Sequence, residues 1–356
     1  MALDFSTPPK SLCILRLSAI GDVTNIVPVV RSIQNFWPQT AITWIVGKTE
    51  HTLVGDIPGI EFLIFDKTKG LSEYLRLHQQ VKNRRYDVLL HMQASIRASF
   101  ACLLIPSPIK LGFDISRGKN LQWLFTNYRI PKTNRQHVLD GFFEYTKFLG
   151  ISDELINWDI PVPDDACKKA DQWLGKNNFF IVINPSSSIR ARNWRNWDAT
   201  NYARLTEYVA NKYGATTVLT GGPSAAEKTF AETIEDKTNI NVLNLVGKTN
   251  LKELMAVLQK ASLVVSPDTG PAHIANAVNT PVIGLYASSN PERTGPYNYR
   301  HLTVNRYPEA IKREFGKDVN EVPWGKRVRN PDAMNLIFFD DVARNIDQVL
   351  GPKIII

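Results

Sequence analysis

The segment SLCILRLSAIGDVTNIVPVVRSIQNFW, residues 11–37, joins an apolar run of strand length to a helical pattern through a short polar turn. The helical pattern comes from apolar side chains that recur on one side of a helix: Ile26, Val30, Ile33 and Trp37. The turn SAIGDV contains the glycine that a tight change of direction requires. The segment therefore predicts a strand, loop and helix unit, the building block of a parallel α/β sheet.

The same alternation of strand and helix patterns continues along the chain and begins again past its middle. Further strand-like runs in the first half are 41–47, 62–66 and 86–93, and those in the second half are 179–188, 215–224, 241–247, 262–273 and 280–286. Strands separated by helices pair in parallel. We therefore expect two Rossmann-like, doubly wound α/β domains that face a central cleft, an architecture typical of transferases that use nucleotide sugars.

A stretch rich in proline and aspartate, INWDIPVPDDACKKA at residues 156–170, interrupts this alternation. Such a stretch is typical of a domain boundary. It divides the chain into an N-terminal domain, 1–160, and a C-terminal domain, 161–335. The remaining residues, 336–356, contain a helical pattern, and we expect this helix to cross back to the first domain.

The chain of 356 residues has 42 basic and 34 acidic side chains, a formal net charge of +8. Residues 1–150 hold 18 basic and 11 acidic side chains, so +7 of this excess lies in the first half. A basic surface suits an anionic partner, which can be nucleic acid, anionic lipid or a phosphorylated substrate. Disordered and fibrous proteins are excluded because 44% of the residues are hydrophobic.

The three cysteines, Cys13, Cys102 and Cys167, are widely spaced and show neither a disulfide nor a zinc pattern. This use of cysteine favours the reducing cytosol. The first residues lack the pattern of a signal peptide, and no apolar run approaches the ~20 residues that span a bilayer. We therefore expect a cytoplasmic protein.

The turn SAIGDV places Asp22 at the start of a helix and at the carboxyl edge of a sheet. Active sites of open α/β folds lie at this edge, so Asp22 is a candidate general base. The alternative is that Asp22 only caps the helix, because a carboxylate accepts the unpaired N–H groups there. The motif alone leaves both interpretations open.

A second candidate turn is SPDTGPAHIANA, residues 266–277, where a strand leads into Asp268, Thr269, Gly270 and then a helix. The N–H groups of this turn and the positive end of the helix suit a diphosphate, although an ordinary capped turn explains the motif equally well. No loop of the chain reads G-x-G-x-x-G or G-x-x-x-x-G-K-S/T. This disfavours a nicotinamide oxidoreductase and a P-loop NTPase.

Two further loops follow strand patterns of the second half. NPSSSIRARNWRNW, residues 184–197, combines small hydroxyl groups with Arg190, Arg192 and Arg195, a composition suited to phosphate. TGGPSAAEK, residues 220–228, has two glycines that leave room for a ribose. It also contains Glu227, whose carboxylate can accept hydrogen bonds from the ribose hydroxyl groups. A solvated basic turn and an ordinary first-turn glutamate are the respective alternatives.

The four motifs are expected at strand carboxyl ends, where they would face one common cleft. No cluster of metal ligands and no Ser-His-Asp pattern competes with them. His91, His137 and His301 lack such a pattern, and we expect them to be structural or surface residues.

The chain resembles a known family because of four motifs taken together. These are IGDV, PSSS with a basic residue before Trp194, GGP with a downstream glutamate, and SPDTGPAH. The sequence resembles the ADP-heptose:lipopolysaccharide heptosyltransferases, heptosyltransferase I-like, over nearly its whole length. This resemblance implies a GT-B fold and an inverting glycosyltransferase that moves heptose from ADP-heptose to a Kdo-containing lipid A in the lipopolysaccharide inner core. Because no metal ligands stand out in the sequence, we expect that no divalent ion is essential, and we expect no cofactor.

The resemblance also implies roles for single residues. Asp22 matches the proposed catalytic base, Ser187 and Ser188 match contacts to the donor diphosphate, and Arg192 matches the residue that neutralises it. Glu227 matches the ribose contact, and Thr249 falls near the adenine pocket. The donor-binding turn comprises Asp268, Thr269, Gly270 and His273, with Asp268 on the heptose hydroxyls. The family commonly has Lys where this chain has Arg192, and it often has Thr where this chain has the paired serines. Whether Arg190 or Arg192 contacts the diphosphate stays open.

On the acceptor side, the resemblance assigns Arg97, Arg117 and Lys119 to the sugar-acid and phosphate groups. Solvated surface charge is the alternative for each. An acceptor embedded in the cytoplasmic leaflet implies an enzyme that is peripherally associated with the inner membrane.

Three other functions are alternatives to heptose transfer. A GT-B transferase for another nucleotide sugar would share the same motifs. A nucleic-acid-binding protein is disfavoured because the basic residues do not alternate with aromatic ones in a recognised module. A family member without activity is disfavoured by the presence of Asp22. The sequence leaves open which heptosyl step is catalysed and whether the acceptor carries one phosphorylated Kdo or two Kdo units, and no oligomer is evident.

Overall fold

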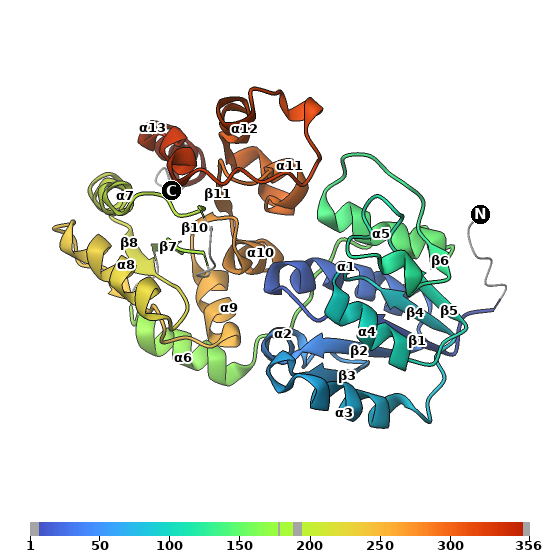
Figure 1. The fold of residues 1–356 in the computed structure, drawn as a ribbon. Helices are drawn as coiled ribbons and strands as arrows, with labels where there is room; N and C mark the ends of the chain where they lie inside the picture. Colours follow the sequence, from blue (N-terminus) through green and yellow to red (C-terminus); the bar gives the residue numbers. More distant parts are fainter. Residues whose placement is uncertain (1–6, 177–178, 188–193, 352–356) are drawn as a thin grey trace. The chain divides into compact units, whose positions relative to one another are not determined.

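The computed structural model describes residues 7–176, 179–187 and 194–351. The chain divides into two compact units, Met1–Pro161 and Val162–Ile356. Each unit is one uninterrupted segment of chain and contains a six-stranded parallel sheet with helices packed on it (Figure 1). The prediction of doubly wound parallel sheets is confirmed for each unit. The division lies one residue after the boundary expected from the sequence.

The first unit alternates strands and helices along the chain. Its elements are β1 (Ser11–Leu15), α1 (Ile20–Phe36), β2 (Ala41–Gly47), α2 (Lys48–Val54), β3 (Ile60–Phe65), η1 (Lys67–Lys69), α3 (Leu71–Val81), β4 (Val88–His91), α4 (Ile96–Leu104), β5 (Ile109–Gly112), η2 (Gln122–Leu124), β6 (Tyr128–Arg129) and α5 (Val138–Phe148). The strands pair in parallel in the order β3-β2-β1-β4-β5-β6.

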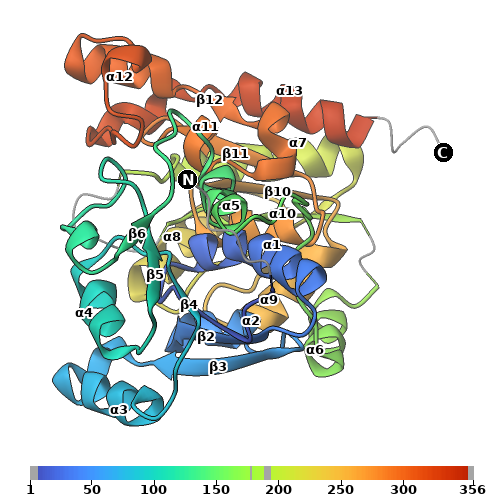
Figure 2. The same cartoon turned by 90° about the vertical axis from the view of Figure 1, so that its right-hand side faces the viewer.

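The first sheet is covered on both faces. Cys13 and Leu15 of β1 point to one face, where they share a core with Leu77 of α3 and Cys102 of α4. Helices α1 and α5 pack against each other on the opposite face, as Figures 1 and 2 show. Because both faces are buried, β1 is apolar along nearly its whole length, as strands of parallel sheets usually are.

The second unit repeats this plan. Its elements are α6 (Asp164–Leu174), β7 (Phe180–Ile183), α7 (Ala199–Tyr213), β8 (Thr216–Leu219), α8 (Ala225–Asp236), β9 (Leu243–Asn244), α9 (Leu251–Lys260), β10 (Leu263–Pro267), α10 (Gly270–Ala277), β11 (Val282–Tyr286), α11 (Pro291–Thr294), η3 (Tyr297–Leu302), β12 (Val304–Asn305), α12 (Tyr307–Phe315), η4 (Val319–Glu321), η5 (Pro331–Leu336) and α13 (Phe339–Leu350). The strand order is β12-β11-β10-β7-β8-β9, with all described pairs parallel.

The C-terminal helix α13 is part of the second unit. Its apolar side chains Val342, Ile346 and Leu350 are fully buried in the core of the second sheet, together with residues of α7. The indole N–H of Trp197 donates a hydrogen bond of 3.0 Å to the carbonyl of Ile337, just before the helix. The helix therefore completes the second core.

Both strand orders contain a point where the direction of winding reverses. In the first sheet this point lies between β1 and β4, and in the second it lies between β7 and β10. Ligands of open α/β sheets bind at the carboxyl ends of the strands that flank such a point. The loops after these four strands are thus the places in which a site is expected in each unit.

Among the described residues, no helix has both the length and the apolar character needed to cross a bilayer.

Candidate active site

Asp22 lies in the first turn of α1, which begins directly after the loop that follows β1. The N-cap of this helix is Ala19, so Asp22 does not occupy the capping position. Its carboxylate instead forms an ion pair with Arg16, the residue that follows β1. The Asp22 side chain is 36% exposed and that of Arg16 only 9% exposed. A carboxylate held in this way can receive a proton from a bound hydroxyl group.

Arg16 is fixed from more than one direction. Its guanidinium group donates to the carbonyl of Met92, which follows β4. The same group lies 5.3 Å from the ring centre of Phe142 on α5, a cation–π distance. Arg16 therefore links the two strands of the first switch point and orients Asp22. Apart from Asp22, neither Arg16 nor its contacts were among the residues expected from the sequence.

Gln93 ties the same two loops together. Its side-chain oxygen accepts the backbone N–H of Leu17 at 2.7 Å and that of Ser18 at 3.2 Å. Its amide nitrogen donates to the hydroxyl of Ser18 at 3.3 Å. Sequence reasoning also missed Gln93, because a single glutamine after a strand carries no recognisable motif.

A pocket of about 110 Å³ opens beside this loop at the carboxyl edge of the first sheet, bounded in part by Ser18, Lys48, Glu50, Lys67 and Arg97. Arg97 is the one acceptor candidate that lines it. Burial raises the pKa of the Glu50 carboxyl, although the helix backbone and the nearby Lys67 and Arg16 oppose this rise. The pocket thus combines exposed cationic groups with a buried carboxyl group.

The other two acceptor candidates lie outside this pocket. Arg117 forms an ion pair with Asp114 and donates to Gln136 at 3.2 Å and to the carbonyl of Pro131 at 2.7 Å. Burial raises the pKa of Asp114, but hydrogen bonds from Ser116 and Arg117 outweigh it and keep this pKa below its usual value. The structure thus gives Arg117 a role in holding its own loop. Lys119 is exposed.

In the second unit, Ser187 follows β7 at the switch point and is buried. Its N–H and its hydroxyl both donate to the side-chain oxygen of Asn196, at 2.9 and 3.1 Å. Asn184 connects the same loop to its neighbours through its backbone N–H, which donates to Val265 of β10 at 3.0 Å. Ser188, Arg190 and Arg192 lie outside the described residues.

Asp268, which follows β10, is buried and is contacted by two arginines. Arg195 donates to its backbone carbonyl at 2.6 Å and to its carboxylate at 3.3 Å, and Arg327 lies 3.8 Å from the same carboxylate oxygen. Arg195 was expected to belong to a phosphate-binding loop. The structure pairs it with Asp268, so the loop after β7 and the turn after β10 are joined.

The turn after Asp268 opens helix α10. Thr269 is its N-cap but does not cap it with its side chain, and its hydroxyl is 2.8 Å from that of Ser266. Gly270 and Pro271 begin the helix, and His273 is buried in its first turn. A helix end without a side-chain cap offers its first backbone N–H groups to an anion.

Glu227 lies in the first turn of α8, which follows β8, and Thr249 lies in the loop after β9. The Glu227 carboxylate accepts the backbone N–H of Gly222 and the hydroxyl of Ser224 at 3.1 Å. In this structure it therefore holds the turn that follows β8. Gly247, two residues before Thr249, donates to the carbonyl of Gly221 at 3.0 Å, so the two loops adjoin.

Gly247 is required by geometry at this junction. Its φ of +73° is left-handed, and a Cβ atom there would lie 2.9 Å from the Lys228 side chain and 3.1 Å from the Pro223 Cα. Only glycine adopts this conformation and approaches so closely without strain.

His91 is the last residue of β4 and is fully buried, with Nε2 3.2 Å from the Ser99 hydroxyl. Burial lowers its pKa to about 3, and the positive charges of Arg16 and Lys110 add to the effect. His137 caps α5 by accepting the N–H of Leu139 at 3.1 Å. Both residues therefore have structural contacts.

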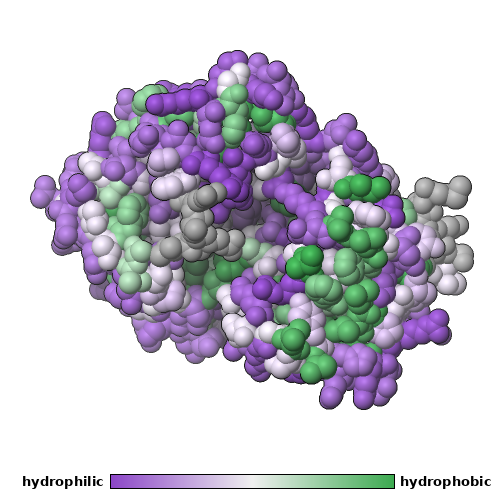
Figure 3. Space-filling view, in the orientation of Figure 1, coloured by the Kyte–Doolittle hydropathy of each residue, from purple (hydrophilic) through white to green (hydrophobic). Residues whose placement is uncertain are grey.

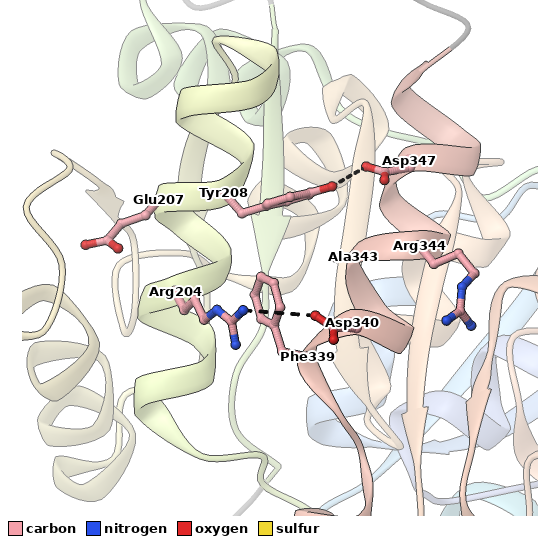
Figure 4. Close-up of a pocket in the computed structure, with 8 residues that line it drawn as sticks. All are labelled: Arg204, Glu207, Tyr208, Phe339, Asp340, Ala343, Arg344 and Asp347. Carbon is pink, nitrogen blue, oxygen red and sulfur yellow. Dashed lines mark hydrogen bonds and ion pairs between the residues drawn. The ribbon is translucent and has the colours of Figure 1, made fainter.

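A larger depression, of about 560 Å³, lies between α7 and α13 in the second unit (Figure 4). Tyr208 donates to Asp347 at 2.6 Å across it, and the Arg204 guanidinium stands 3.8 Å from the ring centre of Phe339. None of the residues expected from the sequence lines this depression. Within the described ranges, no three His, Cys, Asp or Glu side chains gather as a metal site would require.

Residues 74–324 match the model of glycosyltransferase family 9 (heptosyltransferase). The chain is 40% identical to the lipopolysaccharide core heptosyltransferase OpsX of Haemophilus influenzae, over 95% of this chain and 96% of that protein.

Solved structures share the fold. A family 9 glycosyl transferase from Veillonella parvula has a TM-score of 0.79 at 20% identity, covering 99% of both chains. The E. coli heptosyltransferase WaaC with ADP has a TM-score of 0.69 at 18% identity, covering 95% of this chain and 97% of that one. The family match and the 40% identical relative show that this chain belongs to glycosyltransferase family 9, the heptosyltransferases.

Proposed function

We propose that this glycosyltransferase moves heptose from ADP-heptose to a Kdo-containing lipid A during assembly of the lipopolysaccharide inner core. The observation that carries the proposal is the placement of Asp22, a partly exposed carboxylate held by Arg16 at the switch point of the first sheet. The similarity to a lipopolysaccharide core heptosyltransferase supports the substrate class.

Asp22 would act as the general base. A hydroxyl oxygen of the acceptor attacks the anomeric carbon of the heptose and gives its proton to the Asp22 carboxylate. The bond between that carbon and the phosphate oxygen breaks, and its electron pair leaves with ADP. Attack opposite the leaving group inverts the anomeric configuration.

The second unit would hold the donor. Ser187 and Ser188 would contact the diphosphate, Arg192 would neutralise it, and the open end of α10 would add backbone N–H groups from the turn Asp268, Thr269, Gly270 and His273. These groups act mainly in the transition state, because negative charge grows on the departing ADP. No divalent ion enters this scheme.

Recognition of the nucleoside would fall to the loops after β8 and β9. Glu227 would contact the ribose and Thr249 would lie near the adenine. The adjoining positions of these loops support this assignment. Because Glu227 already accepts two hydrogen bonds from its own turn, ribose hydroxyls would share its carboxylate with the turn. Asp268 would hold heptose hydroxyls with the orientation that Arg195 imposes.

The acceptor would meet the basic first unit. Arg97, which lines the pocket beside Ser18, would bind a sugar acid or phosphate of the acceptor. Lys119 would add a further cation, and Arg117 would contribute through the loop that it holds. The enzyme would work in the cytoplasm, peripherally associated with the cytoplasmic face of the inner membrane.

The decisive experiment is a transfer assay from ADP-heptose to defined acceptors that carry one Kdo, one phosphorylated Kdo or two Kdo units. Mass spectrometry and NMR would read the product and its linkage. Parallel reactions with UDP- and GDP-sugars test a different donor specificity. Transfer from one of these donors, with none from ADP-heptose, would refute the proposal, and a reaction in EDTA tests the absence of a metal requirement.

A further inference from the structure

Two helices of the first unit expose apolar side chains on the side that faces away from the core. Leu71 and Leu75 lie one turn apart on α3, and Ile96, Phe100 and Leu103 follow the same helical spacing on α4. With Leu124 of η2, these six side chains are between 50% and 83% exposed. We call these six residues the apolar face.

The apolar face is one continuous surface. The hydroxyl of Tyr74 on α3 donates to the carbonyl of Arg97 on α4 at 3.2 Å, which fixes the two helices side by side. Phe125, next to η2, packs edge-on against Phe100 at 6.0 Å, and its carbonyl accepts the thiol of Cys102 at 3.3 Å. Figure 3 shows the patch as a broad hydrophobic area over α3 and α4.

The opposite sides of both helices are already committed to the core. Leu77 and Val81 of α3 and Ala98 and Cys102 of α4 are fully buried under the first sheet. Both helices are therefore apolar on two sides, and only one of these sides packs in the core. An outward apolar area that the fold does not need is typical of an interaction surface.

Basic side chains border the apolar face. Lys67 and Lys69 precede α3 directly, Arg97 lies on α4, and Lys119 precedes η2, and all four are exposed. The nearby carboxylates of Asp66 and Glu73 pair with Lys48 and Arg76 instead. Apolar side chains surrounded by cations suit a membrane that contains anionic lipid, where each Lys or Arg near the surface adds about 1 kcal/mol.

The apolar face also adjoins the acceptor pocket. Arg97 belongs to the same helix as Ile96 and Phe100, and it lines the pocket beside Ser18. Helices α3 and α4 both begin at the carboxyl edge of the first sheet, the edge that carries Asp22. A lipid headgroup in this pocket would have its acyl chains next to the apolar face.

From these contacts we propose that the apolar face docks on an anionic bilayer, inserting its side chains among the lipid headgroups while the basic border contacts lipid phosphates. This inference rests on the proposed function, because a lipid acceptor gives the docking its purpose. The charge complementarity of the border, and the first half's +7 share of the net charge, favour a membrane over a second copy of the chain.

The test is flotation of the purified full-length protein with vesicles of phosphatidylethanolamine and phosphatidylglycerol, or of phosphatidylcholine alone. The double variant Leu71→Gln with Leu75→Gln should lower the partition coefficient at least about tenfold. Its matched control is Leu155→Gln with Ile156→Gln, two exposed apolar residues near the end of the first unit. This control should float like the wild type.

A second pair tests the charges. Lys67→Glu with Lys69→Glu should reduce binding to anionic vesicles and flatten its salt dependence, while Lys168→Glu with Lys169→Glu, on the exposed surface of α6, should not. Thermal unfolding would confirm that each variant is folded. Equal flotation of the Leu71 and Leu75 variant and the wild type would overturn the proposal.

Two further outcomes are distinguished by separate readouts. In one outcome, the wild type is a dimer, the Leu71 and Leu75 variant is a monomer, and both bind vesicles equally. The apolar face is then an interface between two copies of the chain, and the membrane proposal fails. Transfer to a deacylated, water-soluble acceptor should be retained in the same variant. Absence of transfer in the wild type, with vesicle binding intact, would refute the proposed function but not the docking.

Discussion

Replacement of Asp22 by Asn separates a catalytic role from a structural one. Asn keeps the shape of the side chain but cannot take a proton at neutral pH. Loss of a general base typically lowers a rate by about 10² to 10⁴, which corresponds to ~2.7 to 5.4 kcal/mol of transition-state stabilisation. We therefore expect kcat for heptose transfer to fall by this factor. Affinity for ADP-heptose should change little, because the residues proposed to bind the donor lie on the second unit.

The structural cost of the same change is smaller. Asp22 is 36% exposed, so solvent screens its ion pair with Arg16, and loss of the pair should cost about 1 kcal/mol. Arg16 keeps its hydrogen bond to the Met92 carbonyl. For a unit of this size, such a loss lowers Tm by about 2 to 4 °C, a shift too small to unfold the enzyme at assay temperature.

Asp341 offers a matched control. It also lies in the first turn of a helix and pairs with an arginine, Arg306, but on α13 in the second unit. Asp341→Asn should show a comparable loss of stability with unchanged transfer. The assay measures initial rates by mass spectrometry of the product, donor affinity by calorimetry and Tm for each variant. A folded Asp22→Asn enzyme that retains more than about a tenth of the wild-type kcat would refute the assignment of the base.

Four other substitutions test the remaining contacts. Arg195→Gln should weaken ADP-heptose binding at least about tenfold, because the buried Asp268 loses its closer cation. Arg327 is more distant from Asp268 and more exposed, so Arg327→Gln should have a smaller effect. Equal affinities of the two variants for ADP-heptose, measured by calorimetry, would contradict this ranking. The pKa of His91 is lowered to about 3 in the folded protein, whereas an unfolded histidine has a pKa of about 6.5. Between these two pH values the unfolded chain binds a proton at His91 that the folded chain does not. The free energy of unfolding should therefore fall by ~1.4 kcal/mol for each pH unit below 6.5, down to about pH 3. Urea unfolding at pH 7 and pH 5.5 should show this loss in the wild type and less of it in His91→Gln, and an identical slope in both proteins would contradict it. Glu227→Gln should raise KM for ADP-heptose more than it lowers kcat, and a change in Tm alone would assign Glu227 to the turn only.

The fold was largely predictable because parallel sheets impose a strong local pattern. Buried strands such as β1 are apolar along nearly their whole length, and the helices between them carry an apolar stripe. The stripe of α13 shows the limit of such reasoning. It indicates that one side of a helix is buried but not against which partner. The contact of Trp197 with Ile337, 140 residues away, decides this point and leaves no local trace.

The candidate site divides in the same manner. Residues at strand ends, such as Asp22, Ser187 and Asp268, could be found because their position follows from the strand pattern. Their partners could not. Arg195 contacts Asp268 across 73 residues, and Gln93 contacts Ser18 across 75. Such pairs depend on which strands become neighbours, and the strand order of a sheet does not follow from local periodicity.

The chain passes from one unit to the other only once, between Pro161 and Val162. Each half is therefore encoded by an unbroken stretch of gene, and a single junction is enough to exchange one half between relatives. A hybrid that joins the first half of this protein to the second half of another family member would show which half selects each substrate. Acceptor choice and donor choice could then evolve, or be engineered, as separately inherited traits.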